Sequence, residues 1–163
     1  MHNEKPQKFS PIALILNIAL TLGIGSLGAW ATAGGVKNWY PTINKPSFNP
    51  PSLLFAPVWT TLYILIGIAA YLVWQRRKSV PHFPRTIAIY LIQLILNLAW
   101  SFIFFYMHEI GFALAEIILM FMMILFNGLY FYRISKWAGF LFIPYLLWVG
   151  FAAFLNYSIF MLN

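Results

Sequence analysis

Five long apolar segments constrain the fold of this chain more than any other feature. They cover residues 11–32, 53–74, 87–107, 110–130 and 140–162. Each contains about 20 residues or more, enough for a helix to cross a hydrocarbon core of roughly 30 Å. Backbone groups in lipid must find hydrogen-bond partners within their own segment, so we expect helices, and the alternating pattern of a membrane β-barrel is missing. The sequence therefore predicts an all-α membrane protein, a bundle of five transmembrane helices.

Composition supports a membrane location and excludes several other classes. The chain is 62% hydrophobic and 8% charged, whereas soluble domains carry roughly a quarter charged residues. We expect one transmembrane domain over residues 11–163, preceded by a tail at 1–10. The first apolar run exceeds the usual core of a signal peptide, so we interpret it as a retained span. Cysteine is absent, which removes disulfides and thiolate sites.

The basic residues predict an orientation rather than a nucleic-acid partner. Although the net charge is +7, the cations fall in loops and tails, as orienting charges of membrane proteins do. Five spans place two of them, Lys37 and Lys45, on one side of the membrane. The other side holds Lys5, Lys8, Arg76, Arg77, Lys78, Arg85, Arg133 and Lys136. In a bacterial cell membrane this puts the N-terminus in the cytoplasm and the C-terminus outside, and anionic lipids are the expected partners of the basic side.

The first connecting segment, about 33–52, is the only long loop between the predicted spans. It carries Pro41, Pro46, Pro50 and Pro51. Because proline fixes φ and lowers the entropy lost on ordering, this loop is expected to form a rigid lid. The connection at His108-Glu109 is very short, which predicts that helices 3 and 4 are antiparallel neighbours.

Polar and aromatic residues recur on single faces of three predicted helices. Side chains three or four positions apart stack on one side of a helix, and polar groups in a membrane helix normally face the bundle interior. Such sets are Trp59, Tyr63 and Gly67; Gln93, Asn97 and Trp100; and Pro144, Trp148, Ala152 and Asn156. We expect these faces to line an internal pocket beneath the first loop, with Gly67 and Ala152 leaving room.

Other interpretations of these residues stay open. Trp30, Trp39, Trp74 and Trp137 fit membrane-interface anchors better than ligand contacts. Each amide among Gln93, Asn97 and Asn156 could equally bond a neighbouring helix. Glu116, the one acid well inside a span, is either a relay or ligand partner or, as we favour, a protonated or hydrogen-bonded structural group. The histidines lie at ends or loops, so no metal or axial haem ligation is expected.

The chain resembles the translocator protein family (TspO/MBR), which includes bacterial tryptophan-rich sensory proteins and the mitochondrial peripheral-type benzodiazepine receptor. The resemblance covers almost the whole chain from the first helix onward. It rests on Trp39-Tyr40, Lys45-Pro46, Phe48, Pro50-Pro51, Phe55, Pro57-Val58-Trp59-Thr60, Leu62-Tyr63, Gly67, Tyr71-Leu72-Val73-Trp74, Leu96-Asn97, Trp100-Ser101, Phe104-Phe105, Gly111, Ala113-Leu114, Glu116, Pro144-Tyr145-Leu146, Trp148, Ala152 and Leu155-Asn156.

The resemblance implies a five-helix bundle, often a homodimer, with a ligand cavity closed by loop 1. It implies that no cofactor is required. It also implies ligands such as protoporphyrin IX, haem and sterol-like molecules. The matching pocket positions are Tyr40, Pro50, Trp59, Tyr63, Asn97, Trp100, Trp148 and Ala152.

The chain departs from the family in two places. Leu53 stands where many members carry an aromatic residue, and Leu155-Asn156-Tyr157 lacks the following basic residue of the cholesterol motif. The second departure argues against sterol binding by that motif.

The leading hypothesis is a membrane receptor or carrier for tetrapyrroles, which would stack on tryptophans, with Lys45 as a candidate partner for the propionates. An alternative is light-dependent porphyrin breakdown that uses Trp59 and Trp148. A third is a non-catalytic, stress-regulatory membrane protein. No charged pathway crosses the spans, so coupled transport has no visible machinery in the sequence.

Overall fold

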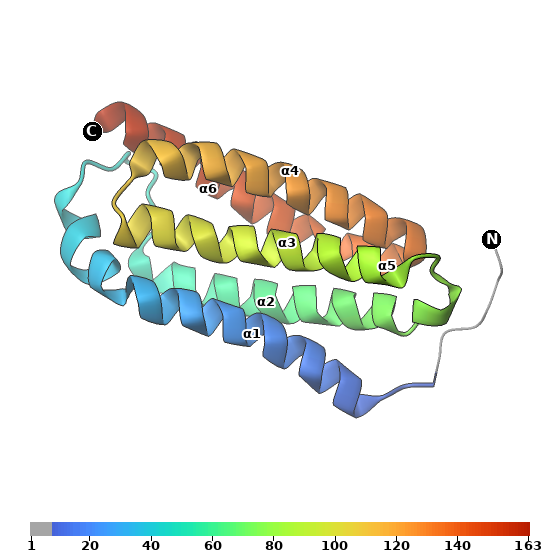
Figure 1. Ribbon diagram of the computed structural model, residues 1–163. Coiled ribbons are helices and arrows are strands. Elements are labelled where there is room, and N and C mark those ends of the chain that lie inside the picture. The colour runs from blue at the N-terminus through green and yellow to red at the C-terminus, as the bar shows by residue number, and fades with distance from the viewer. Residues whose placement is uncertain (1–7) are drawn as a thin grey trace.

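The computed structural model describes residues 8–163 and confirms the predicted helical bundle (Figure 1). Positions 1–7, which include Lys5 and most of the predicted tail, lie outside the described residues. Within 8–163, five helical segments are long and apolar enough to cross a membrane: Pro11–Thr42, Ser52–Trp74, Phe83–Tyr106, Ile110–Ile134 and Lys136–Leu162. Large apolar side chains remain exposed along these segments, as expected of a surface that faces lipid.

The α-helices follow the apolar runs closely but extend beyond several of them. They are α1 (Pro11–Gly34), α2 (Ser52–Trp74), α3 (Phe83–Ser101), α4 (Ile110–Ile134), α5 (Lys136–Phe140) and α6 (Ile143–Leu162). Short π- or 3₁₀-helical turns cover Gly35–Trp39, Tyr40–Thr42, Arg77–Ser79 and Phe102–Tyr106. The predicted third run starts four residues too late because α3 begins at Phe83, with a proline in its first turn.

Local chemistry explains where these helices begin. The Ser10 hydroxyl accepts a hydrogen bond from the backbone N–H of Ala13, and proline occupies the first turn of α1. Two histidines adopt the left-handed backbone conformation. His82, with φ of 56°, directly precedes α3. His108, with φ of 60°, precedes Glu109, the N-cap residue of α4. His108 turns the chain sharply between α3 and α4, which run antiparallel and in contact, as the short connection predicts.

The fifth span, Lys136–Leu162, is divided into two helices. α5 ends at Phe140, and α6 starts at Ile143 with Pro144 in its first turn. Proline has no backbone N–H, so it cannot donate to the carbonyl four residues earlier, and its ring crowds that carbonyl. The break therefore falls where Pro144 requires it.

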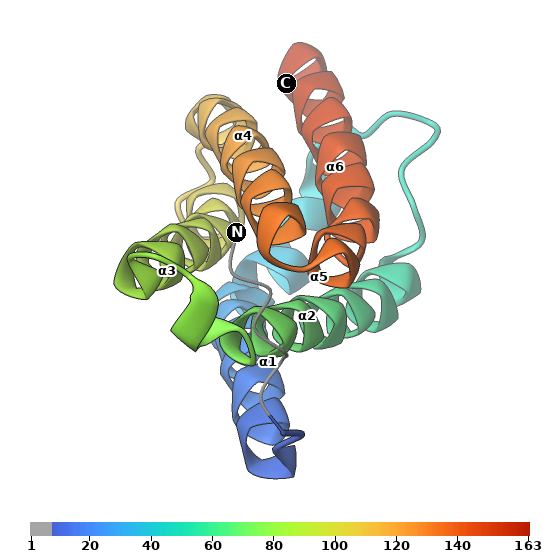
Figure 2. The same ribbon diagram turned by 90° about the vertical axis from the view of Figure 1, so that its right-hand side faces the viewer.

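The helices form a closed arrangement rather than a row (Figure 2). α1 packs on α2 and α3, α4 packs on α3 and α6, and α2 contacts α5 and α6. The main core lies where α2, α3, α4 and α6 meet, and it contains Ile66, Leu94, Ile124 and Tyr145, all fully buried.

A glycine in α2 lets α1 and α2 approach closely. A Cβ at Gly67 would lie 2.7 Å from the Cα of Ile18 and 3.0 Å from the Asn17 carbonyl oxygen. Those neighbours are backbone atoms, so the position admits no side chain without moving a helix. The prediction that Gly67 makes room in the pocket is therefore wrong; its space is taken by the α1 backbone.

The first connecting segment is more ordered than a loop. Its first part continues α1 as helical turns to Thr42, and the irregular part covers 43–51. Three hydrogen bonds fasten it to the end of α6: the N–H of Asn44 donates to Asn163 Oδ1, Asn163 Nδ2 donates to the Asn44 carbonyl, and Asn44 Nδ2 donates to the Leu162 carbonyl. Phe48 stacks on Phe154 with ring centroids 5.2 Å apart. We call this set of contacts the loop clasp.

Candidate functional site

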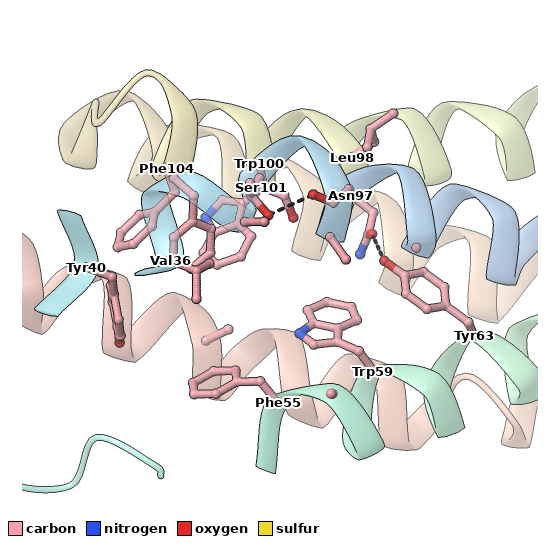
Figure 3. A pocket seen from close by; sticks show the side chains of 18 of the residues that line it. Val36, Tyr40, Phe55, Trp59, Tyr63, Asn97, Leu98, Trp100, Ser101 and Phe104 are labelled. Atoms are coloured by element: carbon pink, nitrogen blue, oxygen red, sulfur yellow. Dashed lines mark hydrogen bonds between the residues drawn. The ribbon is translucent and has the colours of Figure 1, made fainter. Parts of the chain in front are cut away.

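A cavity of about 440 Å³ lies between the helices at the end of the bundle that carries the first loop (Figure 3). α1, α2, α3 and α6 all contribute to its wall. Within residues 8–163, no charged side chain lines it, and most of the wall is aromatic or aliphatic. Its volume falls in the range of roughly 300–1,000 Å³ that is typical of small-molecule sites.

The α2 wall is an aromatic stripe with helical spacing. Phe55, Trp59 and Tyr63 follow each other at intervals of four residues and face the cavity (Figure 3). Trp59 stacks on Tyr63 with centroids 5.6 Å apart, and Phe55 meets Trp148 of α6 edge to face at 6.0 Å. Offset and edge-to-face contacts of this kind hold the rings in defined orientations.

The α3 wall supplies the amide and a second indole. Tyr63 Oη donates to Asn97 Oδ1 at 2.6 Å, and Asn97 Nδ2 donates to Tyr145 Oη at 3.0 Å. Tyr145 Oη in turn donates to Gln93 Oε1 at 3.2 Å. These bonds join α2, α3 and α6, so Asn97 both lines the cavity and bonds neighbouring helices, which combines the two interpretations of the amides.

A second amide fixes Trp100. Its Nε1 donates to Asn156 Oδ1 at 3.1 Å, while Asn156 Nδ2 donates to the carbonyl of Ile110 at the start of α4. The Trp100 ring stacks on Phe104 at 5.4 Å. Both polar ends of the Trp100–Asn156 pair are thus occupied, which leaves the indole face for contact with a guest.

The α6 wall contains Trp148 and Ala152, one turn apart. The small side chain of Ala152 leaves space beside the indoles. Trp148 Nε1 is buried and has no hydrogen-bond partner within residues 8–163. The indole ring lines the cavity, whereas this nitrogen is shielded by neighbouring atoms.

The α1 wall is the part that the sequence reasoning missed. Ser26, Ala29 and Ala33 line the cavity and are also exposed, as are Ala56 and Thr60 of α2 opposite them. These small side chains mark the open side of the cavity. The same face of α1 also packs closely on α2, since a Cβ at Gly25 would overlap the Tyr63 ring.

Seven of the eight predicted pocket positions line the cavity, and ligand binding by them stays a prediction. The seven are Tyr40, Trp59, Tyr63, Asn97, Trp100, Trp148 and Ala152. Pro50 lies outside the lining; it sits in the irregular segment, where its carbonyl accepts a bond from Asn49 Nδ2.

Two other positions on the predicted faces, Gln93 and Pro144, do not line the cavity. Gln93 is fully buried and bonded to Tyr145 rather than lining the cavity, and Pro144 is exposed at the start of α6. Glu116 does not line the cavity, and both its carboxyl oxygens are buried with no partner within residues 8–163.

Lys45 does not point into the cavity. Its ammonium donates to the carbonyls of Tyr40 and Ile43, each at 2.7 Å, and to that of Pro41 at 3.4 Å. Lys45 therefore caps the helical turns that end the first span, since these carbonyls lack helical partners.

The remaining tryptophans divide into two groups. Trp30 and Trp137 are 81% and 73% exposed, and Trp74 carries the Arg77 guanidinium 3.6 Å from its ring centroid, as expected of anchors at a membrane surface. Trp39 instead stacks on His108 at 4.4 Å and packs against Phe104, so it joins the first loop to the turn between α3 and α4. In the described part of the chain, no group of three potential ligands could hold a metal ion.

Comparison with known sequences decides the family. A profile of the TspO/MBR family matches residues 17–162. The chain belongs to the TspO/MBR family. It is 39% identical to the tryptophan-rich protein TspO of Archaeoglobus fulgidus over 93% of this chain and 97% of that one. It is 40% identical to the tryptophan-rich protein TspO of Chlorobaculum tepidum over 93% of this chain and 96% of that one. It is 34% identical to the human translocator protein over 90% of this chain and 87% of that one. This TspO/MBR protein is thus an integral membrane protein, and the resemblance noted in the sequence is confirmed.

Proposed function

We propose that this protein is a membrane receptor or carrier for tetrapyrroles such as protoporphyrin IX and haem, or for related flat hydrophobic molecules. The observation that carries the proposal is a cavity bounded by three indoles, those of Trp59, Trp100 and Trp148. A tetrapyrrole is a broad aromatic disc, and aromatic rings provide large contact areas with a preferred stacking geometry.

The absence of charge in the wall determines how such a ligand would sit. A carboxylate in an apolar site without a partner is strongly disfavoured, and within residues 8–163 no lining residue is charged. Lys45, the cation that the sequence offered as a propionate partner, is already bonded to three carbonyls. The propionates of a porphyrin would therefore stay at the open side, beside Ser26 and Thr60, while the ring enters between the indoles.

Equilibrium binding tests the proposal directly. Protoporphyrin IX should bind the purified protein at one site per chain, as followed by ligand fluorescence polarisation. Ala152→Phe fills the space beside the indoles and should abolish binding, while Ala115→Phe, on the exposed face of α4, should leave it unchanged. Equal binding by both variants would reject the cavity as the site.

The dimethyl ester of protoporphyrin IX tests the orientation. If the propionates remain at the open side without a cationic partner, the ester should bind within about tenfold of the diacid, a difference of roughly 1.4 kcal/mol. A much larger loss would mean that a cation meets the propionates.

Light-dependent porphyrin breakdown is a second candidate, favoured by the oxidisable indoles of Trp59 and Trp148 in the cavity wall. The excited porphyrin and dioxygen would supply the reactivity, since the cavity wall formed by residues 8–163 holds no acid–base pair. Under illumination, Trp148→Phe should then slow the loss of the porphyrin absorption band. An equal rate in wild type and variant would remove the protein from the reaction.

A non-catalytic regulatory role remains the third candidate. Mass analysis of small molecules extracted from the purified protein separates it from the first two, because a regulator without a ligand would carry none.

A further inference from the structure

Four polar residues form a buried row beyond the cavity, and we call them the polar row. Thr86, Tyr90 and Gln93 occupy one face of α3, and Asn127 lies on α4. None is more than 5% exposed. Within residues 8–163, the hydroxyls of Thr86 and Tyr90, Gln93 Nε2, and both Nδ2 and Oδ1 of Asn127 have no hydrogen-bond partner.

The members of the polar row lie close to one another across the α3–α4 contact. On α3 they are separated by four and then three residues, which makes them neighbours on one face. Tyr90 stacks on Phe131 of α4 with centroids 5.9 Å apart, and Asn127 lies one turn before Phe131 on the same buried side. α3 and α4 run side by side in Figure 1.

Hydrogen bonds connect the polar row to the cavity. Gln93 Oε1 accepts from Tyr145, which accepts from Asn97, which accepts from the cavity-lining Tyr63. At the other end, Thr86 is the fourth residue of α3 and so lies only about 4.5 Å along the axis from the first residue of the helix. The row thus extends the polar end of the cavity toward the opposite end of the bundle.

The chemistry of the row selects its ligand. Five unpaired polar atoms in an apolar interior would together cost a large part of the stability of a folded domain. A bound cation would face the amide N–H donors of Gln93 and Asn127, and none of the four members of the row is acidic. Water both donates and accepts, and buried water typically satisfies groups of this kind with two to four partners.

We propose that the polar row binds an internal chain of water molecules, hydrogen bonded to Thr86, Tyr90, Gln93 and Asn127. The hydrogen-bond network that begins at Tyr63 then ends in water rather than in apolar packing. Tyr145 and Gln93 can therefore exchange partners if the Tyr63–Asn97 bond is disturbed, without leaving a buried group unpaired. The water chain does not depend on the identity of any cavity ligand.

Water-edited solid-state NMR of the ¹⁵N-labelled protein in lipid bilayers tests the proposal. Magnetisation should pass from water to Asn127 Nδ2 and Gln93 Nε2 faster than to the backbone amide of Leu94, a fully buried residue next to Gln93. Asn127→Leu and Gln93→Leu assign the two side-chain signals. Tyr90→Phe should slow the transfer to Asn127 Nδ2. Transfer no faster than to Leu94 would overturn the proposal.

Thermal unfolding of Asn127→Leu gives an independent measurement. In a hydrated row the substitution removes water-mediated bonds, so the Tm should stay the same or fall. In a dry row it would remove two unpaired buried groups and raise the Tm by several degrees. A clear rise in Tm would therefore contradict the water chain.

Discussion

Replacing Asn97 by leucine should weaken the attachment of α2 and α6 to α3. The substitution keeps the approximate size but removes the acceptor for Tyr63 Oη, at 2.6 Å, and the donor to Tyr145 Oη, at 3.0 Å. Interhelical hydrogen bonds within membranes contribute about 0.6 kcal/mol on average and about 1.7 at most. Two lost bonds therefore predict a destabilisation of roughly 1–3 kcal/mol.

The expected change is large enough to measure. For a protein of this size, 1 kcal/mol corresponds to roughly 2–4 °C in Tm, so Asn97→Leu should lower the Tm by about 3–10 °C. The assay is thermal unfolding in detergent, followed by circular dichroism, for wild type, Asn97→Leu, Tyr63→Phe and the double variant. Both positions are buried, so the losses should not be screened by solvent.

The double-mutant cycle isolates the Tyr63–Asn97 bond. Once Asn97 is leucine, the Tyr63 hydroxyl has lost its acceptor, so Tyr63→Phe should cost less than in the wild type, or even stabilise. Strictly additive effects, or an Asn97→Leu variant as stable as wild type, would refute the reasoning that this network binds α2, α3 and α6 together.

Three further predictions concern other contacts. Gly67→Ala should lower the Tm by several degrees because the new Cβ would lie 2.7 Å from the α1 backbone. Gly23→Ala is the control, since a Cβ there has no neighbour within 4 Å and should leave the Tm unchanged. Equal Tm values for the two variants would contradict the close α1–α2 contact. Asn163→Ala removes two of the three hydrogen bonds of the loop clasp and a third bond to the carbonyl of Ile159 in α6. In stopped-flow measurements, both the association and the release of a cavity ligand should become faster. Unchanged rates would mean that loop 1 does not control access. Lys45→Met removes the ammonium that caps the Tyr40 and Ile43 carbonyls, so amide hydrogen exchange in residues 40–45 should become faster. The affinity for the neutral dimethyl ester of protoporphyrin IX should not change. A complete loss of ester binding would assign Lys45 to the site itself.

The sequence predicted the fold well because lipid imposes strict rules. Apolar runs of sufficient length must be helices, and the short connection at His108 allowed only antiparallel neighbours. The boundaries were less accurate, since apolar character ends before the helix does. α3 begins four residues before its predicted run, and α5 carries Lys136 at its start.

The candidate site was predicted where periodicity and residue type agree. Trp59, Tyr63, Asn97, Trp100 and Trp148 lie where their helical spacing puts them, around a common space. An α-helix has 3.6 residues per turn, so residues three or four apart point in the same direction. Once the inward-facing side of each helix was identified, these side chains were expected to meet.

The errors have separate physical origins. Gly67 and the α1 wall depend on how closely two helices approach, which is decided by the packing of the whole bundle. Lys45 looked like a ligand partner because cations near a pocket often are, but unpaired carbonyls at a helix end compete for the same ammonium. Asn127 attracted no attention because a single amide in a span has no partner that a sequence can identify.

Fluorescence quenching by protoporphyrin IX tests the central claim most directly, because the protein's own tryptophans report on proximity. Saturable quenching in wild type should weaken strongly when Trp59 and Trp148 are both replaced by phenylalanine. It should persist when the exposed Trp30 and Trp137 are replaced in the same way. Quenching that survives the first pair of substitutions and disappears with the second would place the porphyrin on the outer surface and contradict an indole-lined internal site.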